Sequence, residues 1–388
     1  MFVDYTAEQE MVREMAREFV RREIEPLEEE YDFSRPLARP EVKGIWKRLY
    51  PAFRRVAEGL DLEDLDYISL GIVAEELFKS NPSLACIMAI SISPILMLNL
   101  AERPDLKESY LPLLLSGEKI GCFAITEPDV GSNPAEVRCA AVAEGGHFVV
   151  NGTKTWISNG SISDLAVLVA RVRKDGDEGI GILLVDRDIS PYDSRELPHL
   201  GLKAFPTSEL YFTDCRVPLE NLLVGGGGGK ESSAGLRAVF RGFEVMRTLM
   251  ALGSVGMAQS ALEHSIAYAR QRRQWGKLIG EHQMVQEMVV EMATRIECAR
   301  LLAYRALSLL QQGKRCDRQT SMAKYYATEM AVQVTSLAIQ IHGANGLSEE
   351  FPLERLFRDA RMFTIPDGTT QMQKLIVGRD LLGLSAFC

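Results

Sequence analysis

The spacing of apolar residues changes twice along the chain, and this change limits the folds that the chain can adopt. Up to about residue 118, apolar residues recur every three or four positions, which is typical of amphipathic helices. Between about residues 121 and 223 the chain has short β-branched or aromatic runs separated by Gly, Asn, Asp and Pro, which predicts strands. Beyond about residue 233 the helical spacing returns.

This order of helices, strands and helices predicts an α+β protein that is mostly α. The chain shows no internal repeat and no strand–helix alternation, which argues against a dinucleotide-binding parallel sheet. A length of 388 residues allows two or three domains. We therefore expect a helical domain over 1–118, a β domain over 119–228 and a second helical domain over 229–388.

Local signals locate several elements. Thr6 and Gln9 have the spacing of a capping box, which predicts the start of a first helix. Asn151-Gly152 is typical of a hairpin turn. Further helices are expected over 67–78, 83–100, 110–115 and 370–382, and the segment 83–100 is apolar nearly all round, which predicts burial. A stripe at four-residue spacing predicts ordinary helix core, and its members are Met284, Met288, Met292 and Ile296.

Composition excludes several classes of protein. The net charge of −9 opposes nucleic-acid binding. Seven scattered cysteines without a C-x-x-C pair fit neither a disulfide framework nor a zinc site, which favours reduced thiols in the cytoplasm. The first residues lack a targeting pattern, and no window reaches about 18 consecutive apolar residues, so we expect no membrane span. The run GGGGGK at 225–230 lacks the first Gly and the Ser or Thr of a phosphate-binding loop.

Two segments of the β domain carry residues suited to a planar, polar ligand. In AITEPDVGSN (124–133), Thr126 and Ser132 flank a turn whose hydroxyls and backbone N–H groups suit a ring edge or a phosphate. In NGTKTWISNG (151–160), Trp156 and Ser158 share one face of a strand, which suits a flat heterocycle. An ordinary turn and a strand with a core tryptophan are the alternatives.

Two segments of the last third are also distinctive. RQRRQWGKLIGEHQ (270–283), at the end of a long helix, combines arginine forks with Trp275, which suits phosphate and adenine. The alternative is a solvated helix end. QIHGANG (340–346) is followed by IPDGTTQMQ (365–373), where Asp367 lies in a turn before a helix. For Asp367 the alternative is a helix N-cap.

These four segments, in this order and at these separations, resemble the acyl-CoA dehydrogenase family, and the resemblance extends from Tyr5 to Leu382. It implies a helical N-terminal domain, a central β-barrel-like domain and a C-terminal four-helix bundle. It also implies a homotetramer built from two dimers, with FAD at the dimer interface. The substrate would be an acyl-CoA, and electrons would pass to electron-transferring flavoprotein.

The resemblance assigns residues to FAD. Thr126 would bond the pyrimidine side of the flavin, and Trp156 would pack beside its ring. The other FAD residues of the same subunit would be Ser132, Ser158, Thr369 and Gln371. The partner subunit would contribute Arg272, Trp275, Gln283, Gln340 and Gly343.

The resemblance also assigns Glu244 and Arg247 to the CoA portion of the substrate. Because residues three apart share a helix face, the alternative is a surface ion pair. The helix over 86–98 would wall the acyl pocket. It is apolar apart from Ser91 and Ser93, of which Ser91 is the expected substrate contact, and it supplies no acid for a dicarboxylic acyl group.

Family chemistry needs a carboxylate that removes the α-proton while hydride leaves to the flavin, and Asp367 is the candidate. The family usually has an aromatic residue and glutamate there, whereas this chain has Pro366 and Asp367. Aspartate is shorter by one C–C bond, about 1.5 Å. Some members take the base from the helix of the CoA arginine, but the corresponding Met246 cannot serve, and Glu244 should face elsewhere.

The shorter base and a replaced loop at 51–67 favour a short, branched or alicyclic acyl group, such as cyclohexanecarboxyl-CoA. Two other functions remain open. A nitroalkane-oxidase-like flavoenzyme uses aspartate at this turn, although Glu244 and Arg247 argue for CoA. A helical interaction protein that has lost the chemistry is the other.

Overall fold

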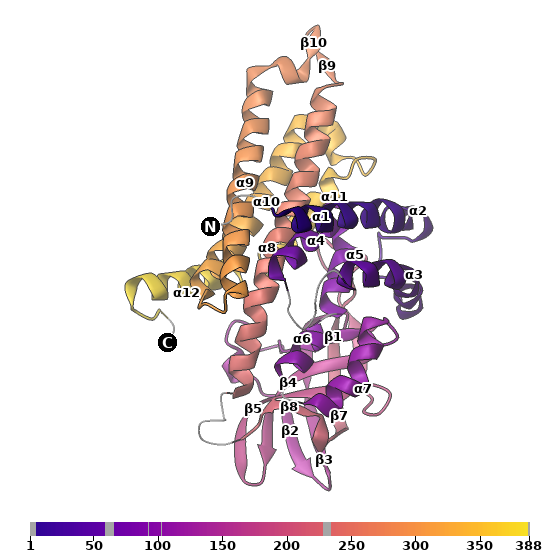
Figure 1. The fold of residues 1–388 in the computed structure, drawn as a ribbon, viewed down its shortest axis with the longest axis vertical. Helices are drawn as coiled ribbons and strands as arrows, with labels where there is room; N and C mark the ends of the chain where they lie inside the picture. The colour runs from indigo at the N-terminus through magenta and orange to yellow at the C-terminus, as the bar shows by residue number, and fades with distance from the viewer. Residues whose placement is uncertain (1–4, 59–65, 92, 102, 228–233, 387–388) are drawn as a thin grey trace.

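The computed structural model describes residues 5–58, 66–91, 93–101, 103–227 and 234–386, and it has the three parts that the apolar spacing predicts (Figure 1). The N-terminal part is helical. Its helices are α1 (Ala7–Phe19), the π-helical η1 (Val20–Ile24), α2 (Leu27–Glu30), α3 (Arg39–Glu58), α4 (Tyr67–Ser80), α5 (Pro82–Ser91), α6 (Ser93–Leu100) and α7 (Pro104–Leu115).

The predicted capping box begins α1. The Thr6 hydroxyl oxygen accepts from Gln9 N at 3.2 Å, and Thr6 N donates to Gln9 Oε1 at 3.1 Å. The reciprocal bonds satisfy backbone donors that the first helical turn leaves free, so this helix starts where the local sequence dictates.

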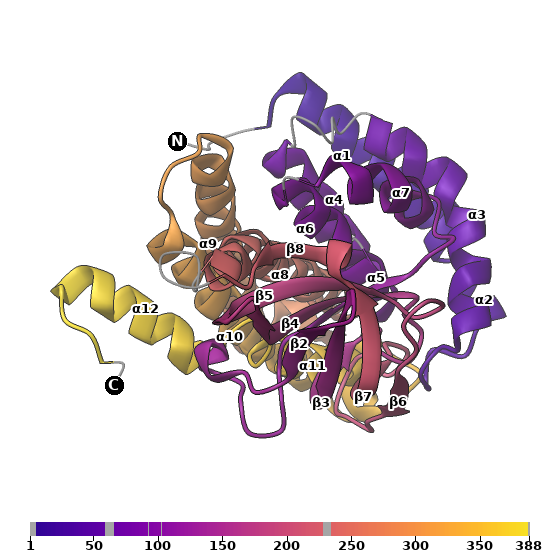
Figure 2. The same ribbon diagram turned by 90° about the horizontal axis from the view of Figure 1, so that it is seen from below.

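An eight-stranded sheet forms the central part. Its strands are β1 (Gly121–Ala124), β2 (Ala140–Glu144), β3 (His147–Ser158), β4 (Leu165–Lys174), β5 (Asp177–Asp186), β6 (Asp193–Glu196), β7 (Thr207–Pro218) and β8 (Leu222–Gly225). The order is β6-β7-β3-β2-β4-β5-β8, and β1 pairs in parallel with β4. Side chains on one face, including Phe148 and Leu168, pack on one another as in a barrel. The other face packs against α6, α7 and the start of the next long helix (Figure 2).

The predicted hairpin turn at Asn151-Gly152 is wrong. Both residues lie inside β3, where the register with β7 shifts between Val150 and Gly152. A Cβ atom at Gly152 would lie 2.8 Å from Cys139 Cα, so glycine allows the close approach of the backbone that leads into β2. The turn that joins β2 to β3 is instead Gly145-Gly146, whose φ values of +55° and +84° suit a two-residue hairpin.

The C-terminal part is built on three long helices (Figure 1). Its elements are α8 (Ala234–Ala269), the hairpin of β9 (Arg273–Gln274) and β10 (Lys277–Leu278), α9 (Gln283–Gln311), α10 (Asp317–His342), the short 3₁₀ segment η6 (Gly343–Leu347), α11 (Leu353–Phe363) and α12 (Thr370–Leu382). The prediction for α12 is confirmed at both ends. One apolar core joins this bundle to α1–α5, with Ile72 and Leu252 both within it.

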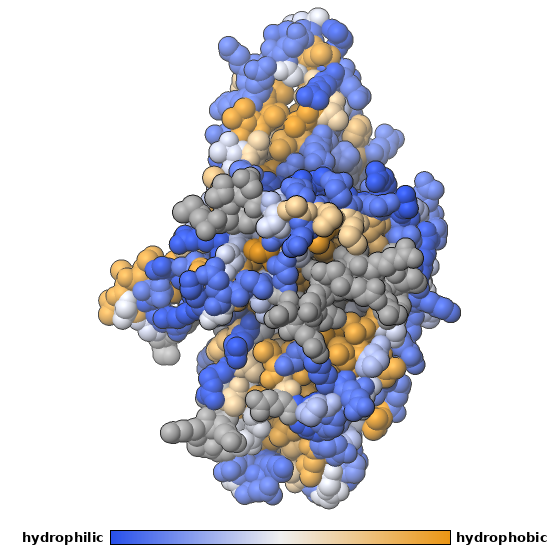
Figure 3. Space-filling model, viewed as in Figure 1, coloured by the Kyte–Doolittle hydropathy of each residue, from blue (hydrophilic) through white to orange (hydrophobic). Residues whose placement is uncertain are grey.

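The methionine stripe on α9 belongs only partly to the core. Met292 and Ile296 are buried, as predicted, whereas Met284 is 75% exposed. The first turns of α9 lie near the β9–β10 hairpin, beyond the packed middle of the bundle, and apolar side chains gather on this end of the surface (Figure 3). The spacing identified a real stripe, but Met284, its first member, stays exposed among the residues that the structure describes.

The segment Pro82–Leu100 is long and apolar enough to cross a membrane by length and composition alone. Within the fold, however, 71% of its most apolar window is buried, as the sequence predicts for a core helix. The six cysteines in the described part of the chain are free thiols, which agrees with the absence of a disulfide framework.

Gly256 marks the closest approach of α8 to α4 and gives a test of this packing. A Cβ atom there would lie 2.3 Å from Glu75 O and 3.0 Å from Lys79 N, and neither backbone atom can move freely. Gly256→Ala is expected to lower the free energy of unfolding by about 1–3 kcal/mol through overpacking. Gly378→Ala on α12, where a Cβ atom meets nothing within 4 Å, is the control and should be neutral or stabilising. Chemical denaturation of both variants measures the difference, and equal stabilities would contradict the packing.

Candidate active site

Asp367 lies in the turn between α11 and α12, with its backbone in the left-handed region at a φ of +54°. Gly368 follows at +88°. The N-cap of α12 is Thr369, whose side chain accepts from Met372 N at 3.3 Å. The alternative interpretation of Asp367 as the helix N-cap is therefore wrong, and the Asp367 carboxylate does not cap α12.

Two buried side chains hold this turn by hydrogen bonds to its backbone carbonyl groups. Gln373 Nε2 donates to Asp367 O and to Gly368 O, both at 3.0 Å. Lys324 Nζ, from α10, donates to Gly368 O at 3.0 Å. Because these bonds fix both carbonyl groups, they also fix the direction in which the Asp367 side chain leaves the backbone.

The Asp367 carboxyl group lies in a charged but poorly solvated environment. Burial raises its pKa, while the cations of Lys324 and Arg247 oppose that rise. Burial in turn lowers the pKa of Lys324 to about 8, against the opposing effect of Asp367. A carboxylate with a raised pKa beside cations is the arrangement expected of a general base.

Arg247 points inward, toward α10. Its side chain is 6% exposed, and Nη1 donates to Ser321 Oγ at 3.3 Å. Burial lowers the pKa of Arg247, and Asp367 and Glu244 oppose that change. Glu244 lies on the same helix face and is partly exposed, but the two form no ion pair in the described part of the chain. The surface ion pair is therefore not the explanation for these residues.

The charge of Asp367 acts on a thiol in the first turns of α5. Burial raises the pKa of the Cys86 thiol well above its usual value, and the charges of Asp359 and Asp367 add to that rise. Further along, Ser91 Oγ donates to Ile87 O at 2.8 Å and accepts from Asn159 Nδ2 at 3.2 Å. Ser93 Oγ donates to Ile90 O at 2.7 Å. Both hydroxyls are thus used within the protein, and the helices present a largely apolar wall.

On the sheet, the structure brings two of the predicted flavin residues together. Thr155 N donates to Thr126 O at 2.8 Å, which holds the strand of Trp156 against the turn of Thr126. The register of β3 shifts between Lys154 and Ile157, and Trp156 lies at this bulge with a φ of +58° and 57% of its surface exposed. Ser158 and Thr126 are partly exposed, and Ser132 is exposed. Trp156 is therefore not a core tryptophan.

A buried ion pair beneath this surface escaped the sequence analysis. Lys154 Nζ lies 2.7 Å from Glu127 Oε1 and donates to Ile125 O at 2.7 Å. Glu127 also accepts from Arg138 N and Cys139 N, at 2.7 and 2.9 Å. Lys154 is fully buried and Glu127 is 6% exposed. The sequence gives little sign of this pair, because threonines flank Lys154 in the strand and because Glu127 lies 27 positions away.

The five residues expected from a partner subunit lie on the surface of the bundle. Trp275 and Gly276 form the turn of the β9–β10 hairpin, and the indole of Trp275 is 93% exposed. This hairpin lies at the opposite end of the molecule from the sheet (Figure 1). The remaining four are also exposed, and they are Arg272, Gln283, Gln340 and Gly343. One chain therefore does not bring them to Trp156.

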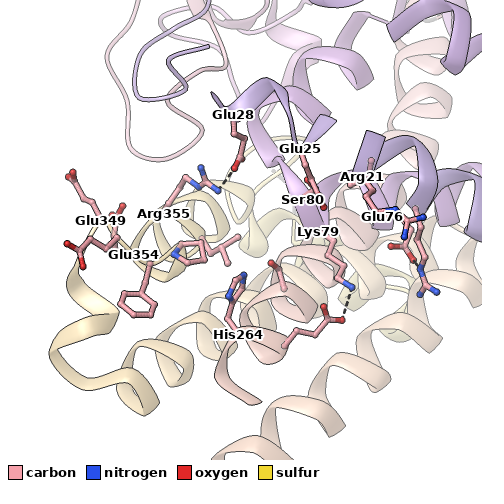
Figure 4. Close-up of a pocket in the computed structure, with 18 residues that line it drawn as sticks. Arg21, Glu25, Glu28, Glu76, Lys79, Ser80, His264, Glu349, Glu354 and Arg355 are labelled. Atoms are coloured by element: carbon pink, nitrogen blue, oxygen red, sulfur yellow. Dashed lines mark hydrogen bonds and ion pairs between the residues drawn. The ribbon is translucent and has the colours of Figure 1, made fainter. Parts of the chain in front are cut away.

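A cavity of about 790 Å³ lies elsewhere, between α1, α4, α8 and α11 (Figure 4). It contains none of the predicted site residues. Two of its cations pair with carboxylates of the same lining: Lys79 Nζ lies 2.7 Å from Glu263 Oε1, and Arg355 Nη2 lies 3.4 Å from Glu28 Oε1. With these cations already neutralised and Asp367 absent from its lining, the cavity is not the candidate active site.

Comparisons with known proteins agree with this arrangement. Three protein families match successive parts of the chain: the acyl-CoA dehydrogenase N-terminal domain at residues 6–118, the middle domain at 122–215 and the C-terminal domain at 233–382. Together they leave only short segments unmatched.

Individual relatives show how varied this similarity is. The chain is 34% identical to a cyclohexane-1-carbonyl-CoA dehydrogenase of Geobacter metallireducens, over 72% of each protein. It is 31% identical to a caffeyl-CoA reductase-Etf complex subunit, CarC, of Acetobacterium woodii, over 97% of this chain and 99% of that protein. Among solved structures, a glutaryl-CoA dehydrogenase of Mycobacterium smegmatis in complex with FADH2 superposes with a TM-score of 0.88 at 25% identity, over 99% and 97% of the two chains.

Proposed function

The chain belongs to the acyl-CoA dehydrogenase family, and from this membership we propose that it oxidises a short, branched or alicyclic acyl-CoA to the α,β-unsaturated thioester. The general activity follows from the family, whose members are FAD-dependent oxidoreductases. The observation that carries the finer proposal is the position of Asp367 on a clamped turn, where its charge acts on Cys86 of α5 and on Arg247 of α8.

The described residues suit FAD. The indole of Trp156 is exposed on the sheet at a bulge, beside the turn of Thr126, and this suits one edge of a flat ring. The N-terminus of α12, with Thr369 and Gln371, suits a phosphate-bearing group. Ser132 and Ser158 complete the proposed set on the same subunit. FAD, when bound, supplies the acceptor for the β-hydride.

A second copy of the chain completes this proposal. Trp275 and Met284 expose 93% and 75% of their surfaces at the far end of the bundle, where a partner can cover them. Residues at that end, with Arg272, Gln283, Gln340 and Gly343 among them, would reach the FAD of the other subunit. We therefore propose a dimer that shares its two FAD sites, assembled into a homotetramer.

In the proposed reaction, Asp367 removes the α-proton of the acyl chain. That proton becomes acidic only when the thioester carbonyl is polarised, and the Asp367 backbone N–H is the proposed donor. In the described part of the chain this N–H donates to no protein acceptor, so it is available to the substrate. Glu244 and Arg247 lie on the proposed CoA side.

The acyl preference rests on the α5–α6 wall. Over residues 86–98, the serines of this wall are Ser91 and Ser93, and both hydroxyls already bond to backbone carbonyls. This part of the wall therefore offers neither a free hydroxyl nor an acid to a polar acyl tail. The replaced loop at 51–67 lies in part outside the described residues. An aspartate base is about 1.5 Å shorter than glutamate, and a compact substrate held closer to it would compensate.

The electron acceptor we propose is an electron-transferring flavoprotein, and the similarity to a subunit of a reductase-Etf complex supports it. The free thiols of the described cysteines agree with a cytoplasmic location, which we also propose.

Anaerobic titration of the FAD-loaded protein with a panel of CoA esters tests the proposal. Cyclohexanecarboxyl-CoA and short branched esters are expected to bleach the flavin absorbance at least about tenfold faster than a long straight-chain or dicarboxylic ester, because a poor fit in the pocket costs about 1–3 kcal/mol. Equal rates for all esters would contradict the acyl preference.

Two other outcomes decide between functions. If no thioester bleaches the flavin absorbance and the protein consumes oxygen when nitroethane is added, the activity is nitroalkane-oxidase-like instead. A protein that takes up no FAD would support a non-catalytic role. Either outcome overturns the proposed reaction.

A further inference from the structure

We infer that Lys324 is a positioning residue for the proposed base: its buried ammonium group holds the turn of Asp367 and favours the ionised form of that carboxyl group. The inference rests on the proposed function, because it takes Asp367 as the base. Neither the family match nor the sequence analysis gives Lys324 a role.

Lys324 occupies the buried polar face of α10. Ser321, Lys324 and Thr328 follow at intervals of three and four residues, and none of them exposes any surface. Thr328 Oγ1 donates to Lys324 O at 3.0 Å, which keeps the hydroxyl within its own helix. Ser321 Oγ accepts from Arg247 Nη1 at 3.3 Å. Two cations therefore lie near this face: Lys324, which belongs to α10, and Arg247, which α8 contributes.

The hydrogen bond from Lys324 Nζ to Gly368 O, at 3.0 Å, fixes the turn one residue beyond the base. Gln373 Nε2 donates to the same oxygen at 3.0 Å. A Cβ atom at Gly368 would lie 2.6 Å from Gln373 Nε2, so the turn has no room to relax toward Gln373. The ammonium group and the amide together hold the peptide that orients Asp367.

A neutral donor would supply the same hydrogen bond, so the charge of Lys324 needs its own explanation. Taking an ammonium group out of water is costly unless a negative partner accompanies it. Asp367 is that partner, since its charge raises the pKa of Lys324 against the effect of burial. The interaction is mutual: the Lys324 cation lowers the pKa of Asp367 against burial.

The pair of Lys324 and Asp367 has further titratable groups around it, and these come from α8, α10 and α5. Arg247 of α8 adds a second cation that lowers the pKa of Lys324 and of Asp367. Glu329 of α10 raises the pKa of Lys324. Its carboxylate also accepts a hydrogen bond from Thr370 Oγ1 at 2.6 Å. The Cys86 thiol of α5 stays neutral, because burial raises its pKa well above the usual value.

The test is the pH dependence of flavin reduction in anaerobic single-turnover experiments on the holoenzyme, with Lys324→Met, Lys324→Arg and the exposed neighbour Lys374→Met as control. Without the cation, the pKa of Asp367 rises and less of the base is ionised in acid. We expect Lys324→Met to be about tenfold slower than the unmodified protein at about pH 6 and within about threefold of it at about pH 8.5. Lys324→Arg and Lys374→Met are expected to keep the unmodified profile.

A second measurement does not depend on catalysis. The folded-state pKa of Lys324, about 8, lies below its ordinary value of 10.5, so between these values the unfolded chain binds more protons. The unmodified protein should therefore gain thermal stability relative to Lys324→Met as pH rises through this window. In an Asp367→Asn background at neutral pH, the loss of stability on adding Lys324→Met should be smaller than in the unmodified protein, because the partner charge is already gone.

The outcomes separate this inference from the proposed function. A rate loss for Lys324→Met that is equal at every pH, or no loss, would overturn the role in ionising the base while leaving the reaction intact. Additive effects of Lys324→Met and Asp367→Asn on stability would overturn it even if no substrate reduced the flavin. Failure of every CoA ester to reduce the unmodified enzyme would instead overturn the proposed function.

Discussion

Replacing Asp367 with asparagine is expected to lower the rate of flavin reduction by acyl-CoA by about 10²- to 10⁴-fold, the range over which a positioned general base contributes. Asparagine keeps the shape of the side chain and the left-handed backbone, which it tolerates well. The loss would therefore report the missing base and not a collapsed turn. Anaerobic stopped-flow absorbance of the FAD-loaded variant is the measurement.

Asp367→Glu is the matched control. It restores a carboxylate and lengthens the side chain by about 1.5 Å, to the residue that the family usually has at this turn. A misplacement of this size costs about a hundredfold at most, so Asp367→Glu should be faster than Asp367→Asn on every substrate that reduces the flavin. Normal reduction in Asp367→Asn would show that another acid is the base, and Glu244 would be the first to test.

The elements that the sequence predicted well depend on local signals. The capping box of Thr6 and Gln9 and the bounds of α12 involve residues within one or two turns of each other, so the chain carries the information in short stretches. The hairpin prediction at Asn151-Gly152 failed because a glycine also occurs where another part of the backbone comes close, and only the fold brings Cys139 there.

The site was predictable in part for the same reason. Asp367 stands in a distinctive turn, but its supports come from α10 and from within α12, and the contact between Lys324 and Gly368 spans 44 positions. The β9–β10 hairpin, which carries the exposed Trp275 in its turn, lies at the opposite end of the molecule from the sheet (Figure 1). Their assignment to FAD stays a prediction, because it depends on a second copy.

Removing Glu127 is expected to destabilise the protein strongly, because its carboxylate is the charged partner of a fully buried lysine. Glu127→Ala leaves the Lys154 ammonium group fully buried with Ile125 O as its remaining partner, and it also strips the acceptor from Arg138 N and Cys139 N. Breaking a buried ion pair from one side costs about 3–5 kcal/mol. We therefore expect a loss of about 5 kcal/mol in the free energy of unfolding, measured by urea denaturation at neutral pH.

Lys154→Met should cost less, about 3 kcal/mol, because the Glu127 carboxylate keeps two backbone N–H donors when the lysine is gone. The ranking of the two variants tests the pair more sharply than either value alone. An exposed pair on the same sheet gives the control: Arg173 Nε lies 2.7 Å from Glu178 Oε2, and Glu178→Ala should change the stability little, because water screens this pair. A cost for Glu127→Ala as small as that of Glu178→Ala would contradict the argument.

The same pair should matter for FAD, because its two residues stand beside the proposed flavin residues in the chain. Glu127 follows Thr126, Lys154 lies two positions before Trp156, and the bond from Thr155 N to Thr126 O joins the two segments. Loss of the ion pair would let this turn and strand separate, so Glu127→Ala should bind FAD at least about tenfold more weakly, as a loss of 1.4 kcal/mol produces. Fluorescence titration of the flavin-free protein measures this affinity. If a folded Glu127→Ala variant bound FAD with unchanged affinity, the ion pair would stabilise the sheet without contributing to FAD binding.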